Sequence, residues 1–139
     1  MSDLHLRHAL PADIDPVLEF WRVAAEGTSI TDDHDGMARL LRTDPEALLL
    51  AERDDTLVGT VIAGFDGWRC SLYRLAVHPD CRRQGIASAL LEAARQRFTA
   101  LGGRRVDAMV LEANEQAHHT WAAAGYHRED HWRRWVASL

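Results

Sequence analysis

The 139-residue sequence contains no lysine, so all 16 of its basic residues are arginines. Schiff-base chemistry and a lysine general base are therefore excluded. The 16 arginines are outnumbered by 21 aspartates and glutamates, which leaves a net charge of −5. We expect no binding to nucleic acid, because neutralising a phosphate backbone needs a basic surface.

Cysteine and long apolar runs are also scarce. Cys70 and Cys81 are too few for a disulfide framework or a cysteine zinc site. The adjacent His118 and His119 would point about 100° apart on a helix, so we expect no metal. No apolar run approaches the roughly 20 residues of a membrane span, and the amino terminus does not resemble a signal peptide. These absences predict a cytoplasmic protein that does not associate with membranes.

The apolar residues that are present make up 47% of the chain, as in an ordinary globular domain, and we expect one domain over residues 1–139. Their spacing predicts both strands and helices. A strand, a crossover helix and a second strand should form one right-handed parallel unit, while hairpins make the rest of the sheet antiparallel. The expected class is α/β or α+β with a mixed sheet. Strands are predicted at 4–8, 47–52, 57–64, 70–77 and 106–111, with weaker alternation through Trp132, Trp135 and Val136, and helices at 13–26, 32–44, 85–101 and 115–124.

The junction between the strand ending at Val77 and the helix beginning near Gly85 carries the strongest functional signal. A loop that enters a helix offers unpaired backbone N–H groups and the positive end of the helix dipole. Gly85 allows an anion to approach the backbone closely, and Arg82 and Arg83 add positive charge. The loop predicts a pyrophosphate site, although a simple capped helix with solvated arginines explains it equally well. The sequence patterns GxxxxGK[ST] and GxGxxG are absent, which disfavours phosphate-hydrolysing and nicotinamide-dependent enzymes.

The hexamer at 82–87 reads R-x-x-G-x-A and resembles the (Q/R)-x-x-G-x-(G/A) signature of the GNAT superfamily, the GCN5-related N-acetyltransferases. An apolar strand that ends Leu-Ala-Val-x-Pro precedes it, and a long amphipathic helix follows. Asn114 and the Gly125-Tyr126 pair also resemble the family's last helix and strand. The Gly-Phe-Asp-Gly turn at 64–67 is similar to that of small bacterial members. The resemblance implies a GNAT fold: a mixed sheet of six to seven strands with about four helices, splayed between the strands at 70–77 and 105–111.

The resemblance also implies acetyl-coenzyme A as the co-substrate. Backbone N–H groups of the loop would bind its pyrophosphate, and the strand before the loop would pair with its pantetheine arm. The amide of Leu75 would polarise the thioester carbonyl as an oxyanion hole. Asn114 would contact the pantetheine, cap the last helix, or do both. The expected cofactor-binding residues are Leu75, Ala76, Val77, Arg82, Arg83, Gln84, Gly85, Ile86, Ala87, Ser88, Asn114 and Trp121.

The groups that would move protons are less well defined. An alkylamine with a pKa near 10.4 is only about 0.04% neutral at pH 7, so its attack needs a base or a proton path. Met109 stands where the ribosomal-protein branch of the family has a glutamate, and Glu112 faces either the site or solvent. Trp121 stands where many relatives have a proton-donating tyrosine, and an indole N–H is not a usable acid. His118 or His119 is an alternative donor. The candidate catalytic residues are Leu75, Tyr73, Glu112 and His118, with packing in the sheet as the alternative role of Tyr73.

Several residues could bind the acceptor. Asp66, Trp68, Arg69 and Trp21 are the candidates, with a place in the core as the alternative for Trp21. The acidic segment 32–35 would attract a cationic amine or only cap a helix, and Arg69 and Arg74 could instead bind a carboxylate.

The predicted function is an acetyl-CoA-dependent N-acetyltransferase. Its acceptor would be a primary amine of a small molecule, an amino acid or a peptide N-terminus, which attacks the thioester directly in a ternary complex. Two alternatives remain open: a non-catalytic acyl-CoA-binding module, and a transferase that uses another acyl donor. A homodimer that pairs the C-terminal segment containing Trp132 and Trp135 is a further hypothesis.

Overall fold

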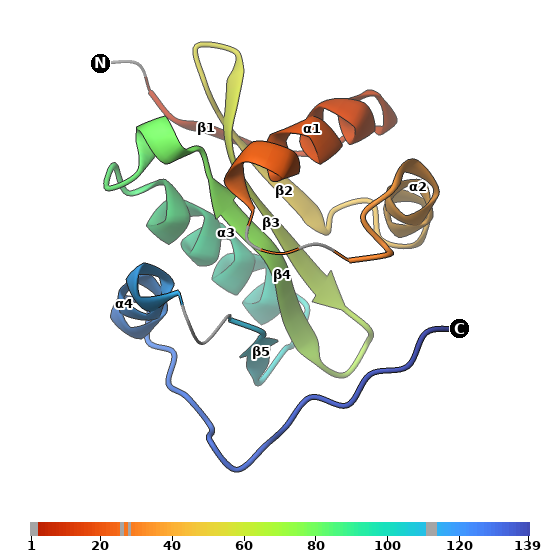
Figure 1. The fold of residues 1–139 in the computed structure, drawn as a ribbon, viewed down its shortest axis with the longest axis vertical. Coiled ribbons are helices and arrows are strands. Elements are labelled where there is room, and N and C mark those ends of the chain that lie inside the picture. The colour runs from red at the N-terminus through yellow and green to blue at the C-terminus, as the bar shows by residue number, and fades with distance from the viewer. Residues whose placement is uncertain (1–2, 26, 28, 111–113) are drawn as a thin grey trace.

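The computed structural model describes residues 3–25, 27, 29–110 and 114–139, and its centre is one mixed β-sheet (Figure 1). Five strands lie in sequence order: β1 (His5–His8), β2 (Leu48–Arg53), β3 (Thr56–Phe65), β4 (Cys70–Val77) and β5 (Val106–Ala108). The first four pair antiparallel, and β5 is parallel to β4. The predicted mixed α/β class and the parallel crossover unit are therefore confirmed.

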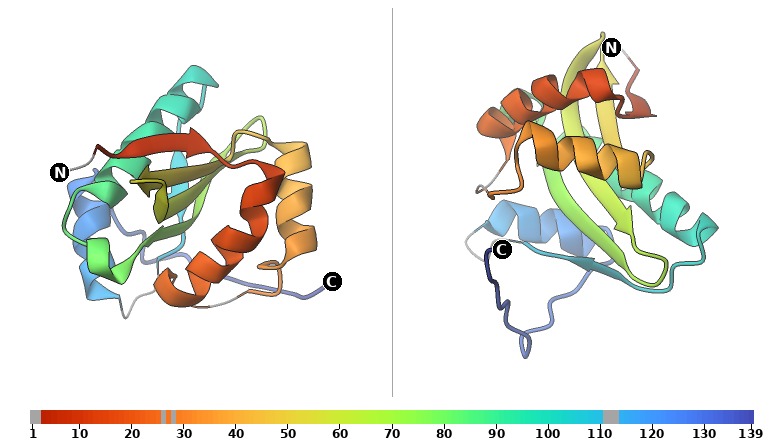
Figure 2. Two further views of the ribbon diagram at one scale, coloured as in Figure 1. Left: turned by 90° about the horizontal axis from the view of Figure 1, so that it is seen from above. Right: turned by 90° about the vertical axis from the view of Figure 1, so that its right-hand side faces the viewer.

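Helices cover both faces of this sheet (Figures 1 and 2). The two helices α1 (Ile14–Ala24) and α2 (His34–Thr43) pack on one face, and α3 (Ile86–Ala100) and α4 (Glu115–Ala123) lie on the other. Short 3₁₀ turns at Pro11–Asp13 and Pro79–Cys81 precede α1 and α3. Within the ranges described above, no helix has the length and hydropathy needed to span a membrane.

The buried part of β2, residues 48–51, is a continuous apolar run because each face of the sheet has its own core. Leu48 and Leu50 of β2 pack under α1 and α2, whereas Leu49 and Ala51 point to α3. A strand that is buried on both faces reads as a continuous apolar run instead of an alternating one. This is why residues 47–51 show no alternation in the sequence.

The sheet opens between β4 and β5. Only Cys70, Ser71 and Leu72 of β4 pair with β5, opposite Val106–Ala108. The remainder of β4 runs past the end of this ladder, so its backbone is not paired with β5. The predicted splay between these strands is thus present in the structure.

A β-bulge interrupts β4 on its other side. Thr60 of β3 pairs with Ala76 and Ile62 pairs with Tyr73, so two residues of β4, Arg74 and Leu75, lie opposite one residue of β3. The φ angle of Arg74 is +53°, a left-handed conformation that non-glycine residues adopt rarely. The surrounding contacts must therefore hold this backbone in place.

The predicted number of strands is wrong. Residues 127–139 contain no strand or helix, which leaves five strands in the described chain instead of six to seven. Trp132 and Trp135 are 67% and 93% exposed, and the segment is tied to the start of β5 by an ion pair of 2.6 Å between Arg105 and Glu129. The weak alternation of apolar residues in this segment does not produce a strand, because a strand also needs a neighbouring strand to pair with. The homodimer stays a prediction.

The structure shows which aspartates cap a helix with their side chains and which do not. Asp33 caps α2, since its carboxylate accepts from the Gly36 N–H at 2.8 Å. Asp13 does not cap α1 with its side chain. Its carboxylate instead accepts from the Leu10 N–H at 2.7 Å and from the Arg7 guanidinium at 2.8 and 2.9 Å.

This arrangement predicts a loss of stability in acid. The Arg7 guanidinium lowers the pKa of Asp13 below its ordinary 3.8. A group whose folded pKa is depressed stabilises the fold above its unfolded pKa and loses that contribution as pH falls through the folded value. We expect Asp13→Asn to lower the free energy of unfolding at pH 7 by about 1–2 kcal/mol, and this difference to vanish below the folded pKa. Denaturant unfolding between pH 7 and 2.5 measures it.

Asp80→Asn is the matched control, because the Asp80 side chain is 90% exposed. It should leave the pH dependence unchanged. A destabilisation by Asp13→Asn that stays constant across the whole pH range would contradict the role of the Asp13 charge.

Candidate functional site

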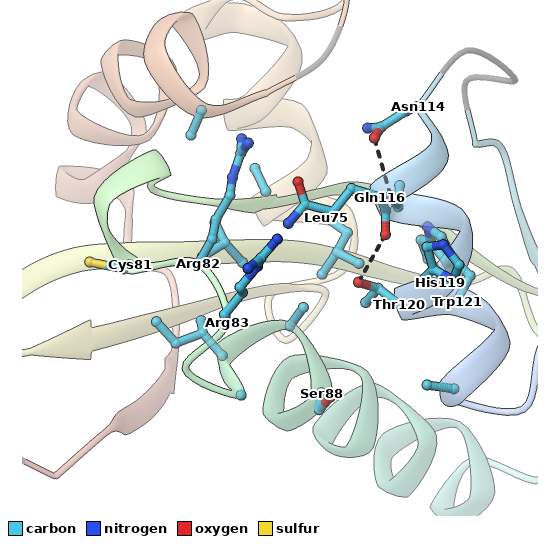
Figure 3. A pocket seen from close by; sticks show the side chains of 18 residues that line it. Leu75, Cys81, Arg82, Arg83, Ser88, Asn114, Gln116, His119, Thr120 and Trp121 are labelled. Atoms are coloured by element: carbon cyan, nitrogen blue, oxygen red, sulfur yellow. Dashed lines mark hydrogen bonds between the residues drawn. The ribbon is translucent and has the colours of Figure 1, made fainter.

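A cavity of about 390 Å³ lies where β4 extends past β5 (Figure 3). Leu75, Ala76 and Val77 of β4 form one wall, and residues from α4 form the opposite wall. The loop after β4 and the first turn of α3 close one end, and Ala24 at the end of α1 reaches the rim. This volume lies in the range of small-molecule sites.

The loop that leads into α3 is shaped for close contact with an anion. Arg83 and Gly85 both have left-handed φ angles, +63° and +80°. Gly85 is the N-cap of α3, and a Cβ added there would meet no atom within 4 Å. The first N–H groups of a helix have no partner within the helix, so they are available to a ligand. Open space, helix N–H groups without an intrahelical partner and the neighbouring guanidinium groups together make this loop suited to an anion.

The structure gathers all but one of the predicted cofactor-binding residues around this cavity. The exception is Gln84, whose side-chain oxygen accepts from the Nη1 of Arg53 at the end of β2. Part of the α4 wall was not among the predicted residues. A spacing of three and six residues from Asn114 was a usable signal for Ala117 and Thr120, since these positions lie near the helix face of Asn114 and Trp121. The additional lining residues are Ala24, Cys81, Gln116, Ala117, His119, Thr120 and Ala123.

Asn114 serves as a helix cap at the edge of the cavity. Its Oδ1 atom accepts from the Ala117 N–H at 3.1 Å, which fixes the start of α4. The cap does not use the Nδ2 group, and Figure 3 shows this side chain at the top of the α4 wall. The capping role is confirmed, and contact with pantetheine stays a prediction.

Trp121 lines the cavity and also packs against the core on the α3 face of the sheet. Its ring meets that of Tyr126 edge to face, with centroids 5.0 Å apart and an interplanar angle of 81°. Burial raises the pKa of Tyr126. Trp121 thus gives the cavity an apolar wall held by a partly buried aromatic neighbour.

Only some of the predicted catalytic residues line the cavity between β4 and α4. Leu75 lines the cavity, but Tyr73 is 53% exposed on β4 and is not in the lining. In the described part of α4, His119 lines the cavity and His118 does not. Glu112 lies outside the described residues.

The predicted acceptor residues at the β3–β4 turn lie at the opposite end of β4 from the loop that leads into α3. The Asp66 carboxylate accepts from the N–H groups of Arg69 and Trp68 at 2.7 and 2.8 Å, and these bonds lower its pKa. The guanidinium of Arg69 stacks 4.5 Å from the Trp68 ring. These contacts build the turn, and none of the three residues lines the cavity.

Trp21 corrects another expectation. It is 5% exposed in the core under α1, and its indole N–H donates to the Thr60 hydroxyl at 2.8 Å. Helical spacing of apolar residues on α1 turned this ring toward the sheet instead of the surface. The alternative of a core residue is therefore confirmed, and direct contact with an acceptor is not.

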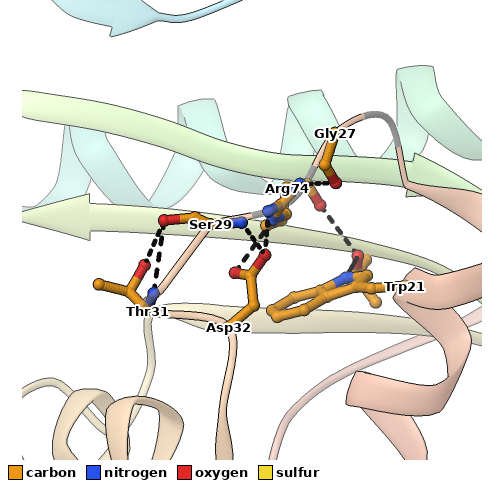
Figure 4. A network of polar contacts seen from close by, with 7 residues as sticks. Trp21, Gly27, Ser29, Thr31, Asp32 and Arg74 are labelled. Atoms are coloured by element: carbon orange, nitrogen blue, oxygen red, sulfur yellow. Dashed lines mark hydrogen bonds and ion pairs between the residues drawn. The ribbon is translucent and has the colours of Figure 1, made fainter.

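The acidic segment before α2 is largely occupied by its own contacts (Figure 4). Asp32 pairs with Arg74 on β4, and their side chains are only 22% and 14% exposed. Arg74 also donates to the Gly27 carbonyl at 3.3 Å. Because Asp33 caps α2, capping and internal pairing account for this segment better than an open acidic rim.

A second cavity of about 500 Å³ lies between the end of α2 and the end of α3. Arg97 in its wall donates to both Asp44 carboxylate oxygens, at 2.7 and 2.6 Å, and to the Ala63 carbonyl at 3.0 Å. Its charge is thus engaged by the protein. Among the described residues, no group of three His, Cys, Asp or Glu is placed to hold a metal ion.

Comparison with known proteins places the chain among acetyltransferases. The model of the acetyltransferase (GNAT) family matches residues 14–126. An acetyltransferase of Yersinia pestis strain Pestoides F is 34% identical over 118 residues, which cover 85% of this chain and 84% of the relative.

Solved structures share the fold. The PaiA N-acetyltransferase from Thermoplasma acidophilum, in complex with coenzyme A, superposes with a TM-score of 0.79 at 18% identity over 92% of both chains. The aminoglycoside antibiotic 6′-N-acetyltransferase of Acinetobacter baumannii gives 0.77 at 15% identity over 99% of both chains.

Proposed function

This chain belongs to the GNAT family of acetyltransferases, and from that membership we propose that it transfers the acetyl group of acetyl-CoA to a primary amine. The neutral amine attacks the thioester carbonyl, a C–N bond forms and the C–S bond breaks. The nitrogen gives up one proton to water, and coenzyme A leaves as a thiolate that takes up a proton from solvent. The observation that carries this proposal is the cavity between β4 and α4, which ends at the N-terminus of α3. The coenzyme A bound to the Thermoplasma acidophilum relative supports the choice of co-substrate.

In this proposal each part of acetyl-CoA has a place. The pyrophosphate lies on the N–H groups of residues 83–88, beside Arg82 and Arg83. The pantetheine extends along the part of β4 that has no β5 partner and passes Asn114. The Leu75 amide donates to the thioester oxygen, where negative charge grows in the transition state.

The acceptor is an amine of a small molecule, an amino acid or a peptide N-terminus. The name of the Acinetobacter baumannii relative gives an aminoglycoside as one such acceptor in this fold. An α-amino group with a pKa near 8 would need little help from a base, whereas an alkylamine near 10.4 would need a proton path. The thiolate can leave without a tyrosine acid, because thiols have pKa values near 8.5.

Calorimetric titration with acetyl-CoA and with longer acyl-CoA thioesters, followed by an acceptor panel, tests the proposal. The panel contains spermidine, kanamycin and a peptide with a free N-terminus, and released thiol reports turnover. Cys81 is partly exposed, so each reaction is read against a blank without acceptor. Binding with turnover of at least one amine is expected. Binding without any turnover would favour a non-catalytic module, and tighter binding of a longer acyl-CoA would favour another donor.

Trp121→Phe should retain most of the activity. The indole does not supply the proton in this account, so the loss should appear as weaker acetyl-CoA binding from reduced packing against Tyr126. We expect kcat to stay within about threefold. Trp121→Tyr should raise kcat if the new hydroxyl reaches the sulfur. A fall in kcat of roughly a thousandfold in Trp121→Phe, with unchanged affinity, would mean that the indole acts in the transition state.

A further inference from the structure

Thr60 stands out because, in the part of the chain that the structure describes, it is the only polar residue buried in the core, at 0% exposure. It lies on β3, beside the bulge in β4. Its hydroxyl has two partners: it accepts from the Trp21 indole N–H at 2.8 Å, and it donates to the Arg74 carbonyl at 2.9 Å. Figure 4 shows Trp21 and Arg74 side by side at this point.

The chemistry of these groups fixes the direction of the hydrogen bonds. An indole N–H can only donate, so the Thr60 oxygen must accept from Trp21. The single hydroxyl proton is then directed to the Arg74 carbonyl, which can only accept. The chain of hydrogen bonds therefore runs in one direction, from Trp21 through Thr60 to the backbone of β4.

The Arg74 carbonyl belongs to the same peptide unit as the Leu75 N–H. The described chain contains no cis peptide bond, and in a planar trans unit the C=O and N–H groups point in opposite directions. Because Thr60 lies on β3, a carbonyl directed to Thr60 leaves the Leu75 N–H directed away from β3. That is the side on which β4 has no β5 partner and on which Leu75 lines the cavity.

The same bulge is restrained by the Arg74 side chain. The guanidinium lies 5.7 Å from the Trp21 ring centroid and is bound by Asp32 and the Gly27 carbonyl. The left-handed backbone of Arg74 is thus held by the Thr60 hydroxyl at its carbonyl and by the loop after α1 at its side chain. Trp21 touches both restraints.

We propose that Thr60, oriented by Trp21, is a positioning residue that aims the Leu75 amide at the thioester carbonyl and polarises it. Accepting a hydrogen bond at the carbonyl makes the N–H of the same peptide unit a stronger donor, because linked hydrogen bonds reinforce one another. Neither side chain lines the cavity. The proposal rests on the proposed acetyl-CoA site, and it gives the buried Trp21 a role other than the acceptor contact expected from the sequence.

The test uses acetyl-CoA labelled with ¹³C at the thioester carbonyl. In the wild type, binding should move the carbonyl resonance downfield, since hydrogen bonding to the oxygen withdraws electron density from the carbon. Thr60→Val, which has the same shape without the hydroxyl, should lose most of this shift, while the acetyl-CoA dissociation constant changes by less than about threefold. With an amine that turns over, kcat should fall roughly ten- to a hundredfold, as for a misplaced oxyanion-hole donor. Thr60→Ser keeps the hydroxyl and should retain the shift.

A core truncation on α1, Val17→Ala, controls for general loss of stability. Val17 is fully buried, and its side chain has no hydrogen-bonding group that could hold the bulge. This variant should therefore keep the wild-type shift. If Thr60→Val does not fold, Trp21→Phe removes the first donor of the chain and should reduce the shift in part.

The outcomes separate the two proposals. A wild-type protein that does not bind acetyl-CoA would overturn the proposed function itself. Binding with a downfield shift that Thr60→Val or Trp21→Phe leaves unchanged would overturn only the positioning role. Loss of the shift in Val17→Ala would also overturn it, because the effect would then follow stability instead of the Thr60 hydroxyl.

Discussion

Gly85→Glu is expected to abolish measurable acetyl-CoA binding, a loss of at least roughly a hundredfold in affinity, while the chain still folds. The new side chain would stand where the cavity meets the N-terminus of α3, and open space surrounds this position. A carboxylate there would take the place of the pyrophosphate and repel it. The left-handed φ of +80° adds backbone strain of about 1–2 kcal/mol.

Gly102→Glu is the matched control for that strain. Gly102 follows the other end of α3, has a φ of +86°, and a Cβ added there would meet no atom within 4 Å. It does not line the cavity. The two variants should lose similar stability, and only Gly85→Glu should lose binding by calorimetry. Equal acetyl-CoA affinities in the two variants would contradict the placement of the pyrophosphate at this loop.

Arg97→Met should produce the largest loss of stability, about 3 kcal/mol in the free energy of unfolding. The Arg97 side chain is only 12% exposed and binds both oxygens of Asp44 as well as the Ala63 carbonyl. Its removal leaves the partly buried Asp44 carboxylate without this cation, which is costly. Denaturant unfolding at pH 7 measures the effect.

Two further variants interpret that loss. Arg22→Met makes the same substitution in an ion pair whose side chains are 76% and 68% exposed, and it should cost well under 1 kcal/mol. Adding Asp44→Asn to Arg97→Met should recover part of the stability, because the unpaired charge is removed. If Arg97→Met is as mild as Arg22→Met, the contact between Arg97 and Asp44 does not hold the end of α2 against α3.

The sequence predicted the candidate site best where the site is built from backbone groups, at the loop before α3. The glycine and arginines of 82–87 and the apolar strand before them predicted the loop, and the structure places that loop at the cavity. The hydrophobic spacing on 85–101 also predicted α3 to within one residue of each end. The Arg97 side chain of this helix is largely buried for a reason that the helix itself does not show, because its partner Asp44 is 53 residues away.

Features that depend on distant partners could not be read from local patterns. The bulge at Arg74 depends on Thr60 and Asp32, which lie 14 and 42 residues away in the chain. An aromatic residue at helical spacing, such as Trp21, suits either a core or a binding site until the sheet beneath it is known. The C-terminal alternation predicted strands, but β5 pairs over only three residues and no ladder extends to that segment.

Backbone amide chemical shifts during titration with acetyl-CoA test the central claim most directly. If the cavity beside β4 is the acetyl-CoA site, the largest ¹H and ¹⁵N shifts should fall in Leu75–Val77 and in residues 82–88. The Gly85→Glu variant should show none of them. Saturable shifts that centre instead on Thr43–Glu46 and Arg97, around the second cavity, would contradict the account.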